Sequence, residues 1–231
     1  PDDNFEQALI DLGYDDTLDD YVLTASISGV TSLDVREKEI SDLTGIEGFT
    51  ALTYLDCPDN LLTSLDVSSN TDLTSLQCQR NSLTSLDVSA NTALINLNCG
   101  DNQLTSLNVS SNTALEVLHN HNNQLTSLDL SSNTALTYLT ASDNPLTALD
   151  VSVNTALTIL KCTNTQLTAL DVSANTALTN ITSNNNSLTS LDVSANTALT
   201  YLNVSDNQLT SLDVSANTAL DFLDCQSNQL T

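Results

Sequence analysis

The sequence predicts a β-rich solenoid with two parallel β-sheets, and three observations lead to this fold. The chain repeats itself every 21 residues from residue 52 to its last residue, without an insertion. A fixed period of this length indicates one supersecondary unit per repeat, stacked on the unit before it. Each repeat contains two short stretches in which apolar and polar residues alternate, as half-buried strands do. The segments between these stretches are too short for helices, so we expect few or no helices within the repeats.

Residues 1–29 are predicted to form an N-terminal cap. Phe5, Leu9 and Leu12 are spaced as on one face of a helix, with an Asp pair before them and Gly13 after them. Asp is a preferred residue at the start of a helix and Gly at its end. We expect this short helix, together with residues 21–27, to cover the open end of the core, because the first coil of a solenoid has no preceding coil.

Residues 30–231 are predicted to form the solenoid itself. Residues 30–51 make a first repeat of 22 residues, residues 52–219 make eight repeats of 21, and residues 220–231 begin a last, truncated repeat. We therefore expect about ten coils and a right-handed rod with weak curvature. Because the sequence stops within a repeat, it also predicts that the chain is a fragment of a longer protein.

Residues 73–93 illustrate one repeat. Leu76 and Cys78 are predicted to point inward from the first strand, and Leu86 and Val88 from the second. Each strand has an equivalent strand one period away, so stacking would produce two parallel sheets. The predicted core is Leu at four slots, followed by Val, Ala and Cys.

The five cysteines occupy one slot of the repeat, which Ala141 and Val204 fill elsewhere. Stacked strands would hold neighbouring Cβ atoms roughly 4.8 Å apart, whereas a disulfide requires about 3.8 Å. The expected state is therefore a set of free, buried thiols. These cysteines are Cys57, Cys78, Cys99, Cys162 and Cys225.

Two asparagine columns are predicted to close the turns of the coils. A carboxamide both donates and accepts hydrogen bonds, so it can satisfy backbone groups that strand pairing leaves free. The first column is Asn60, Asn81, Asn102, Asn123, Asn144, Asn186, Asn207 and Asn228, with Thr165 as its one exception. The second column is Asn70, Asn91, Asn112, Asn133, Asn154, Asn175, Asn196 and Asn217.

The repeat pattern LxxLxCxxNxLxxLDVSxNTA resembles the leucine-rich repeat family. It is most similar to the bacterial class in which LxxLxL and LxxLDL halves alternate. The first repeat, in which Lys38 replaces the column Asn, is similar to internalin repeats. The resemblance covers nearly the whole chain and implies a leucine-rich repeat solenoid in a secreted or bacterial cell-surface protein. It says almost nothing about the ligand.

Composition excludes several classes of function. Four Lys+Arg against 29 Asp+Glu give a formal net charge of -25, and such a surface repels nucleic acid and anionic membranes. The sequence has no apolar run of the length that spans a membrane and no motif of a nucleophile elbow, phosphate loop or zincin. We expect a non-enzymatic monomer without a cofactor, without nucleic acid and without membrane insertion.

The first strand varies where the rest of the repeat is constant, which makes its outward side the candidate ligand-binding surface. Exposed aromatic residues among Asn, Gln and Thr suit contacts with a protein or a polysaccharide. Random drift on an unselected face is the alternative, because Tyr and Phe favour strands in any case. The candidate residues are Tyr54, His119, His121, Tyr138, Ile159, Lys161, Tyr201 and Phe222. The sequence thus predicts a recognition or adhesion module, with a structural spacer of a larger cell-surface protein as the alternative.

The second stretch has a recurring outward Asp with three interpretations: a solvated face whose carboxylates accept hydrogen bonds from nearby Ser hydroxyls or turn N–H groups, Ca²⁺ bridging, or a catalytic carboxylate pair. The solvated face is favoured, and no pocket or distinct partner singles out a catalytic pair. This column is Asp66, Asp87, Asp129, Asp150, Asp171, Asp192 and Asp213, with Asn108 as its exception. A second acidic cluster, formed by Asp15, Asp16, Asp19 and Asp20, is a further Ca²⁺ candidate without the spacing of an EF-hand.

The two histidines are a weaker metal candidate. His119 and His121 share one face of a strand, but no third ligand accompanies them. We therefore interpret them as a polar contact pair.

Overall fold

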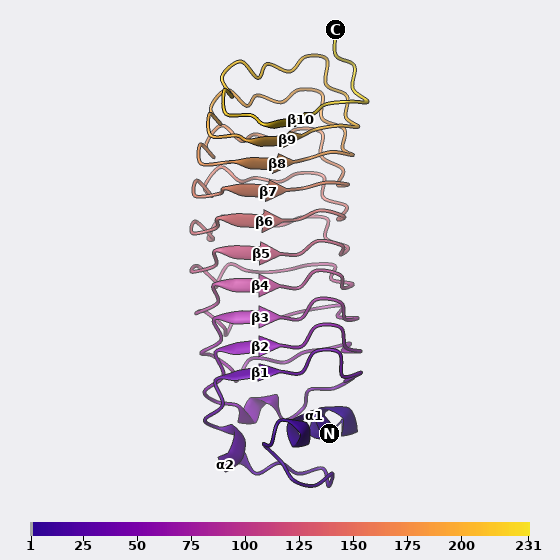
Figure 1. The fold of residues 1–231 in the computed structure, drawn as a ribbon, viewed down its shortest axis with the longest axis vertical. Helices are drawn as coiled ribbons and strands as arrows, with labels where there is room; N and C mark the ends of the chain where they lie inside the picture. Colours follow the sequence, from indigo (N-terminus) through magenta and orange to yellow (C-terminus); the bar gives the residue numbers. More distant parts are fainter. Residues whose placement is uncertain (1) are drawn as a thin grey trace.

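The computed structural model describes residues 2–231 and shows a parallel β-solenoid (Figure 1). Its helices are α1 (Asp3–Asp11), α2 (Thr24–Ile27) and the 3₁₀ helix η1 (Ile46–Gly48). Ten three-residue strands follow: β1 (Ser32–Asp34), β2 (Tyr54–Asp56), β3 (Ser75–Gln77), β4 (Asn96–Asn98), β5 (Val117–His119), β6 (Tyr138–Thr140), β7 (Ile159–Lys161), β8 (Asn180–Thr182), β9 (Tyr201–Asn203) and β10 (Phe222–Asp224). No helix in this described part combines the length and hydropathy of a membrane span.

The strands form one parallel sheet in the order of the sequence, in a nearly straight column (Figure 1). Ser32 of β1 pairs with Tyr54 of β2, and Tyr54 pairs with Ser75 of β3, so the register advances by 22 residues and then by 21. The central residue of each strand from β1 to β9 is a Leu or Ile with 0% exposure, and its two neighbours point outward. The alternation along the first stretch therefore predicts its strands correctly.

The expected second sheet is not formed. Between the second stretches of neighbouring coils the described chain has a single isolated bridge, from Asp66 to Asp87. The Asp side chain explains the difference, because Asp66 Oδ1 accepts a hydrogen bond from the backbone N–H of Ser68 at 2.9 Å. A backbone donor held in this local turn is not available to the neighbouring coil.

The asparagine columns tie the coils together as expected. Asn102 Nδ2 donates to the carbonyls of Cys78, Cys99 and Gly100, and its Oδ1 accepts from the N–H of Leu83. In the second column, Asn133 Nδ2 donates to the carbonyls of Val109 and Asn112 in preceding coils. Each side chain thus replaces backbone pairing where the chain turns.

The cap contains the expected helix, but it covers the open end of the core less completely than expected. Asp2 accepts hydrogen bonds from the first turn of α1, while Phe5 and Leu9 are buried against the first coil. Leu12 lies just beyond the helix and is 44% exposed. Beyond α1, Tyr21 is 79% exposed, so residues 21–27 cover the core only in part. The predicted cap began at Pro1, which lies outside the described residues.

All five cysteines are free thiols, as predicted, and four of them are fully buried. Cys225, in the last coil, is only partly buried. Burial raises the pKa of the Cys99 thiol to about 12 and that of Cys162 to about 11, because an apolar interior disfavours the thiolate. The cysteines accordingly pack as small apolar groups.

Candidate functional site

The candidate residues lie on one surface, which we call the outer sheet face. It consists of the outward side chains of β1–β10 and the residue two positions after each strand. Tyr54 and Phe222 are 37% and 42% exposed, respectively. His119, His121, Tyr138, Ile159, Lys161 and Tyr201 are all half-buried. Half-burial on a strand fixes the position of a side chain while leaving part of it open to a partner.

Three of these residues form what we call the Tyr138 cluster. The His119 ring lies 4.9 Å from the Tyr138 ring, and Lys161 Nζ lies 5.6 Å from the Tyr138 ring centroid. Because β5 and β7 flank β6 on opposite sides, Tyr138 is contacted from both sides. The pKa of His119 is lowered by burial, then by His121 and Lys161. The imidazole is therefore neutral near pH 7, and Lys161 carries the charge of the cluster.

A second aromatic group lies further along the outer sheet face. The rings of Tyr201 and Phe222 are stacked, with centroids 4.4 Å apart and an interplanar angle of 7°. This stacking follows from the register, because Tyr201 and Phe222 are direct partners in β9 and β10. Asn180 and Thr182 of β8 separate the stacked pair from the Tyr138 cluster.

Tyr54 belongs to a charged group that the sequence did not reveal. Arg36 donates hydrogen bonds to both Asp34 and Asp56, and Tyr54 lies 3.4 Å from the Asp56 carboxylate. Burial raises the pKa of Asp56, although the Arg36 guanidinium opposes this shift. The N-terminal end of the outer sheet face is therefore occupied by internal ion pairs.

His121 has a specific seat that the sequence did not indicate either. Its ring lies over Gly100 so closely that a Cβ at that position would be 2.4 Å from His121 Cε1. Its Nε2 lies 3.3 Å from Asp101 Oδ2, and Asn122 Nδ2 donates to Asp101 Oδ1. Gly100 and His121 occupy the same slot in neighbouring coils, so the absence of a side chain at position 100 makes room for the His121 ring.

A column of residues with positive φ forms one edge of the outer sheet face. Glu, Asp, Asn, Arg and Ser occupy it, and Asp and Asn tolerate this conformation better than most residues do. The column consists of Glu37, Asp59, Arg80, Asp101, Asn122, Asp143, Asn164, Asn185, Asp206 and Ser227. The recurring Asp and Asn at this slot are the signal in the sequence for this edge, which was not among the predicted features.

The Asp column on the other side of the solenoid forms turns. Every member accepts a hydrogen bond from the backbone N–H two residues later, as Asp129 does from Ser131 at 2.9 Å. Asn108 makes the same bond to Ser110 at 3.0 Å. Hydrogen bonds from the Ser131 hydroxyl and N–H lower the pKa of Asp129. The interpretation as solvated carboxylates that accept hydrogen bonds from turn N–H groups is confirmed.

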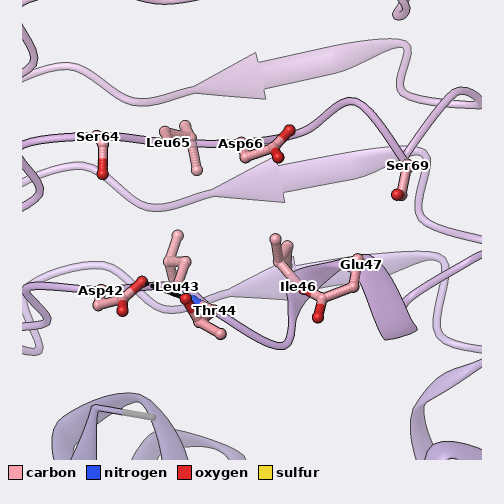
Figure 2. A pocket seen from close by; sticks show the side chains of 9 residues that line it. All are labelled: Asp42, Leu43, Thr44, Ile46, Glu47, Ser64, Leu65, Asp66 and Ser69. Carbon is pink, nitrogen blue, oxygen red and sulfur yellow. Dashed lines mark hydrogen bonds between the residues drawn. The ribbon is translucent and has the colours of Figure 1, made fainter.

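A hollow on this side is also lined by turn-forming acids (Figure 2). It measures about 360 Å³ and lies between the first two coils, next to Asp42, Glu47 and Asp66. Asp42 accepts from Thr44, and Glu47 accepts from the N–H of Gly45. Each of these carboxylates therefore already stabilises a local turn.

The acidic cluster of the cap is also engaged locally. The backbone N–H groups of Asp19 and Asp20 donate to the Glu6 carboxylate, at 2.8 and 3.1 Å. Asp15 accepts from the N–H of Asp16, whose carboxylate accepts from Thr17. Across residues 2–231, no group of three or more His, Cys, Asp or Glu side chains is arranged to hold a metal ion. Ca²⁺ binding by these residues stays an untested prediction.

Comparisons with known proteins agree with this architecture. The Leucine Rich repeat family model matches residues 121–138 and 195–216. Internalin J of Listeria monocytogenes serotype 4b (strain F2365) is 44% identical over 71 residues, which are 31% of this chain and 8% of that protein. The structure of the functional domain of InlJ from Listeria monocytogenes, described as including a cysteine ladder, matches with a TM-score of 0.96 and 43% identity. The match covers 100% of this chain and 51% of that one.

A more distant solved structure shows the same fold. The leucine-rich repeat protein LIC12759 of Leptospira interrogans has a TM-score of 0.85 at 24% identity, over 90% of this chain and 57% of that one. The chain thus spans about half the length of the InlJ structure and a small part of Internalin J itself.

The stacked coils, the Leu slots and the asparagine columns define a leucine-rich repeat solenoid. Within that class, the sequence identity to Internalin J and the structural match of the InlJ domain along the whole of this chain indicate a likeness to the internalins. The chain is an internalin-like leucine-rich repeat protein.

Proposed function

We propose that this chain is a non-enzymatic recognition or adhesion module that binds a protein or a glycan through the outer sheet face. One observation carries the proposal: side chains differ from repeat to repeat on this face and still contact one another across strands. The Tyr138 cluster and the stacked pair are ordered in this way. Rigid, half-buried aromatic side chains are the usual anchors of binding surfaces.

The proposed location is the bacterial cell surface or the extracellular medium. The likeness to Internalin J supports it. We propose no catalytic role for the histidines or the Asp column. Asp101 already holds His121, and the Asp column makes turn hydrogen bonds.

The experiment uses an array of extracellular-matrix proteins and polysaccharides probed with the labelled chain. Replacing both Tyr138 and Tyr201 by Ala should abolish the signals that the wild type gives. A control variant replaces Ser85 and Thr126, exposed on the opposite side, by Ala, and should bind like the wild type. Equal binding by all three proteins would refute recognition through the outer sheet face.

A structural spacer is the alternative function, and the regular repeat allows a direct test. Deleting residues 73–93 removes one whole repeat, including β3, and leaves β5–β10 intact. A recognition module should then bind its targets with unchanged affinity. A spacer would instead lose function in proportion to the repeats removed, with no dependence on Tyr138 or Tyr201.

We assign no cofactor to this function. Glu6 already closes the loop that carries the cap acids, so the melting temperature should be the same in Ca²⁺ and in chelator. An increase of several degrees in Ca²⁺ would instead establish a structural Ca²⁺ site.

A further inference from the structure

The outer sheet face differs in charge from the rest of the molecule. The chain has 29 Asp+Glu residues, yet none lies in the seven consecutive strands from β3 to β9. The residue two positions after each of these strands is also never acidic. The nearest carboxylates lie at the edges of the face: Asp101 and Asp143 in the positive-φ column, and the exposed Glu116 directly before β5. A partner that docks on these strands therefore avoids most of the protein's negative charge.

Lys161 is the one cation of the described chain without a carboxylate partner. Arg36 pairs with Asp34 and Asp56, Lys38 pairs with Asp11, and Arg80 lies near Asp59 and Asp101. Lys161 lies over the Tyr138 ring instead. An ammonium held by an aromatic ring keeps its charge and its hydrogen-bond donors for a further partner.

The neighbouring strand adds a second donor. Lys161 pairs with Thr182 in the register of β7 and β8, and Asn180 lies on the same side of β8. Asn180 Oδ1 accepts from Thr182 Oγ1 at 3.2 Å, whereas the Asn180 NH₂ group has no hydrogen-bond partner within residues 2–231. Lys161 Nζ lies over the Tyr138 ring of β6, on the side of β7 away from β8, so the Asn180 amide is placed to donate to a neighbouring carbonyl of the partner rather than to the group that Lys161 binds.

The geometry around Tyr138 favours a peptide over a sugar. Sugar rings stack on open aromatic faces, but Lys161 Nζ lies over the Tyr138 ring and the His119 ring packs against it at a tilt of 56°. Tyr201 and Phe222 cover only one face of each other and lie outside this cluster. Tyr138 therefore presents mainly its edge and its hydroxyl group, which suit the side chains of a protein.

We propose that Lys161, held within the Tyr138 cluster, binds the carboxylate of an acidic side chain in a protein partner. The inference rests on the proposed recognition function and assigns a chemical class to its partner. A Glu or Asp next to apolar residues would place its carboxylate on Lys161 and its neighbours against Tyr138 and Ile159. A strongly acidic partner would be repelled by the remaining carboxylates, so a single acidic residue in a neutral segment fits best.

The test uses a blocked nonapeptide of Ser, Ala and Leu with one central Glu, and the same peptide with Gln. Peptide binding to the full chain is followed by NMR at about 0.15 M salt, where charges further apart than about 8 Å are screened. The Glu peptide should shift the resonances of Lys161, Asn180 and the Tyr138 ring. The Gln peptide should bind about two- to fivefold more weakly, as expected for one exposed ion pair.

Matched variants identify the charge that is responsible. Lys161→Gln should lower the affinity for the Glu peptide to that for the Gln peptide, and Lys161→Arg should restore most of the difference. Lys38→Gln removes a cation that Asp11 already pairs and should change nothing. Equal affinities of the wild type and Lys161→Gln for the Glu peptide would overturn the inference.

An acidic oligosaccharide of uronic acid units provides the competing arm. If it binds through Lys161 more tightly than the Glu peptide, the partner is a glycan and the inference is overturned. If neither probe depends on Lys161 while the Tyr138 and Tyr201 substitutions still abolish array binding, the recognition function stands and only the acidic partner is rejected.

Discussion

At the scale of single residues, Asn102 and Thr165 show how much one side chain contributes to a coil. The Asn102 carboxamide makes four hydrogen bonds to the backbone, one of them to the N–H of Leu83. Thr165, at the same slot, has a single hydroxyl proton to donate, and its Oγ1 lies within hydrogen-bond distance of the Cys162 carbonyl and Asn186 Oδ1. The N–H of Leu146, which an Asn at 165 would bind, turns to the Asn144 carbonyl instead.

The two residues allow a reciprocal test. Asn102→Thr should destabilise the fold by about 1–3 kcal/mol, because buried backbone groups lose their partners. Thr165→Asn should stabilise it by up to about 1 kcal/mol, because the column is completed. Urea unfolding of both variants measures these changes, and shifts of equal sign would contradict the role given to the column.

A second prediction concerns the seat of His121. Replacing Gly100 by Ala should displace the His121 ring, because the new Cβ would overlap it. In a His121→Ser background the same change should stabilise the protein by about 0.4–1 kcal/mol, since Ala restricts the unfolded chain more than Gly does. The described glycines with positive φ are Gly13 and Gly45. Gly100 is not one of them, so its backbone conformation is open to Ala.

A double-mutant cycle in urea, combined with the NMR resonances of the His121 ring, measures this coupling. If Gly100→Ala changes the free energy of unfolding equally with His and with Ser at position 121, the two residues are independent. The packing of the His121 ring over Gly100 would then contribute nothing to stability.

At the scale of structural elements, the two halves of each repeat differ in how they use their polar residues. The first half pairs its backbone with the neighbouring coil, and its polar side chains point outward. In the second half, the Asp of the LDV segment accepts a hydrogen bond from the backbone N–H of the Ser two residues later, as Asp87 does from Ser89. The second half therefore has the alternation of a strand but forms a row of turns.

These turns predict a dependence of stability on pH. Hydrogen bonds from Ser lower the native pKa of Asp129, Asp150 and Asp171 below the usual value of about 3.9. A lowered native pKa means that the unfolded chain binds protons first as the pH falls. The stabilisation is therefore complete above about pH 4 and is lost as the pH falls through the native pKa values.

Replacing these three Asp residues by Asn should leave the melting temperature near that of the wild type at pH 7, because Asn108 makes the same turn naturally. The same variant should lose less stability at low pH than the wild type does. Replacement by Ala should lower the melting temperature at both pH values. If Asn and Ala behave alike at pH 7, the turn hydrogen bonds do not stabilise the fold.

The sequence predicts the elements of this fold better than the contacts of its candidate site. Leu at fixed slots was enough to identify the strands and the inward side chains. The second sheet was expected because its residues alternate as in a strand. Alternation alone does not show that Asp66 accepts a hydrogen bond from the backbone N–H of Ser68. The slots of Tyr138 and Lys161 were predicted, but their contact joins different repeats and depends on strand register. The fit of His121 over Gly100 depends on ring orientation, which no residue pattern contains.

At the scale of the whole molecule, the net charge of -25 acts on a rod in which each coil contacts mainly its neighbours. Like charges repeat along the axis at the spacing of the coils, so repulsion accumulates with length. The packed aliphatic core must offset this repulsion in every coil.

The melting temperature should therefore rise between about 0.01 and 0.15 M NaCl, as the screening length falls from about 30 to about 8 Å. The expected rise is about 2–4 °C for each kcal/mol of repulsion that is screened. Calorimetry or circular dichroism measures it, and the variant with Asn at 129, 150 and 171 should show a smaller rise. A melting temperature that falls with salt would mean that the ion pairs outweigh the repulsion.

Because all five cysteines occupy one slot of the repeat, their reactivity reports the local opening of the coils that contain them. Four of these thiols are sealed in the interior, at coils spread from β2 to β7, and the fifth sits near β10. An alkylating reagent reaches a sealed thiol only when its coil separates from a neighbour. Labelling rates at Cys57, Cys78, Cys99, Cys162 and Cys225 would thus show, coil by coil and without any engineered probe, where unravelling begins.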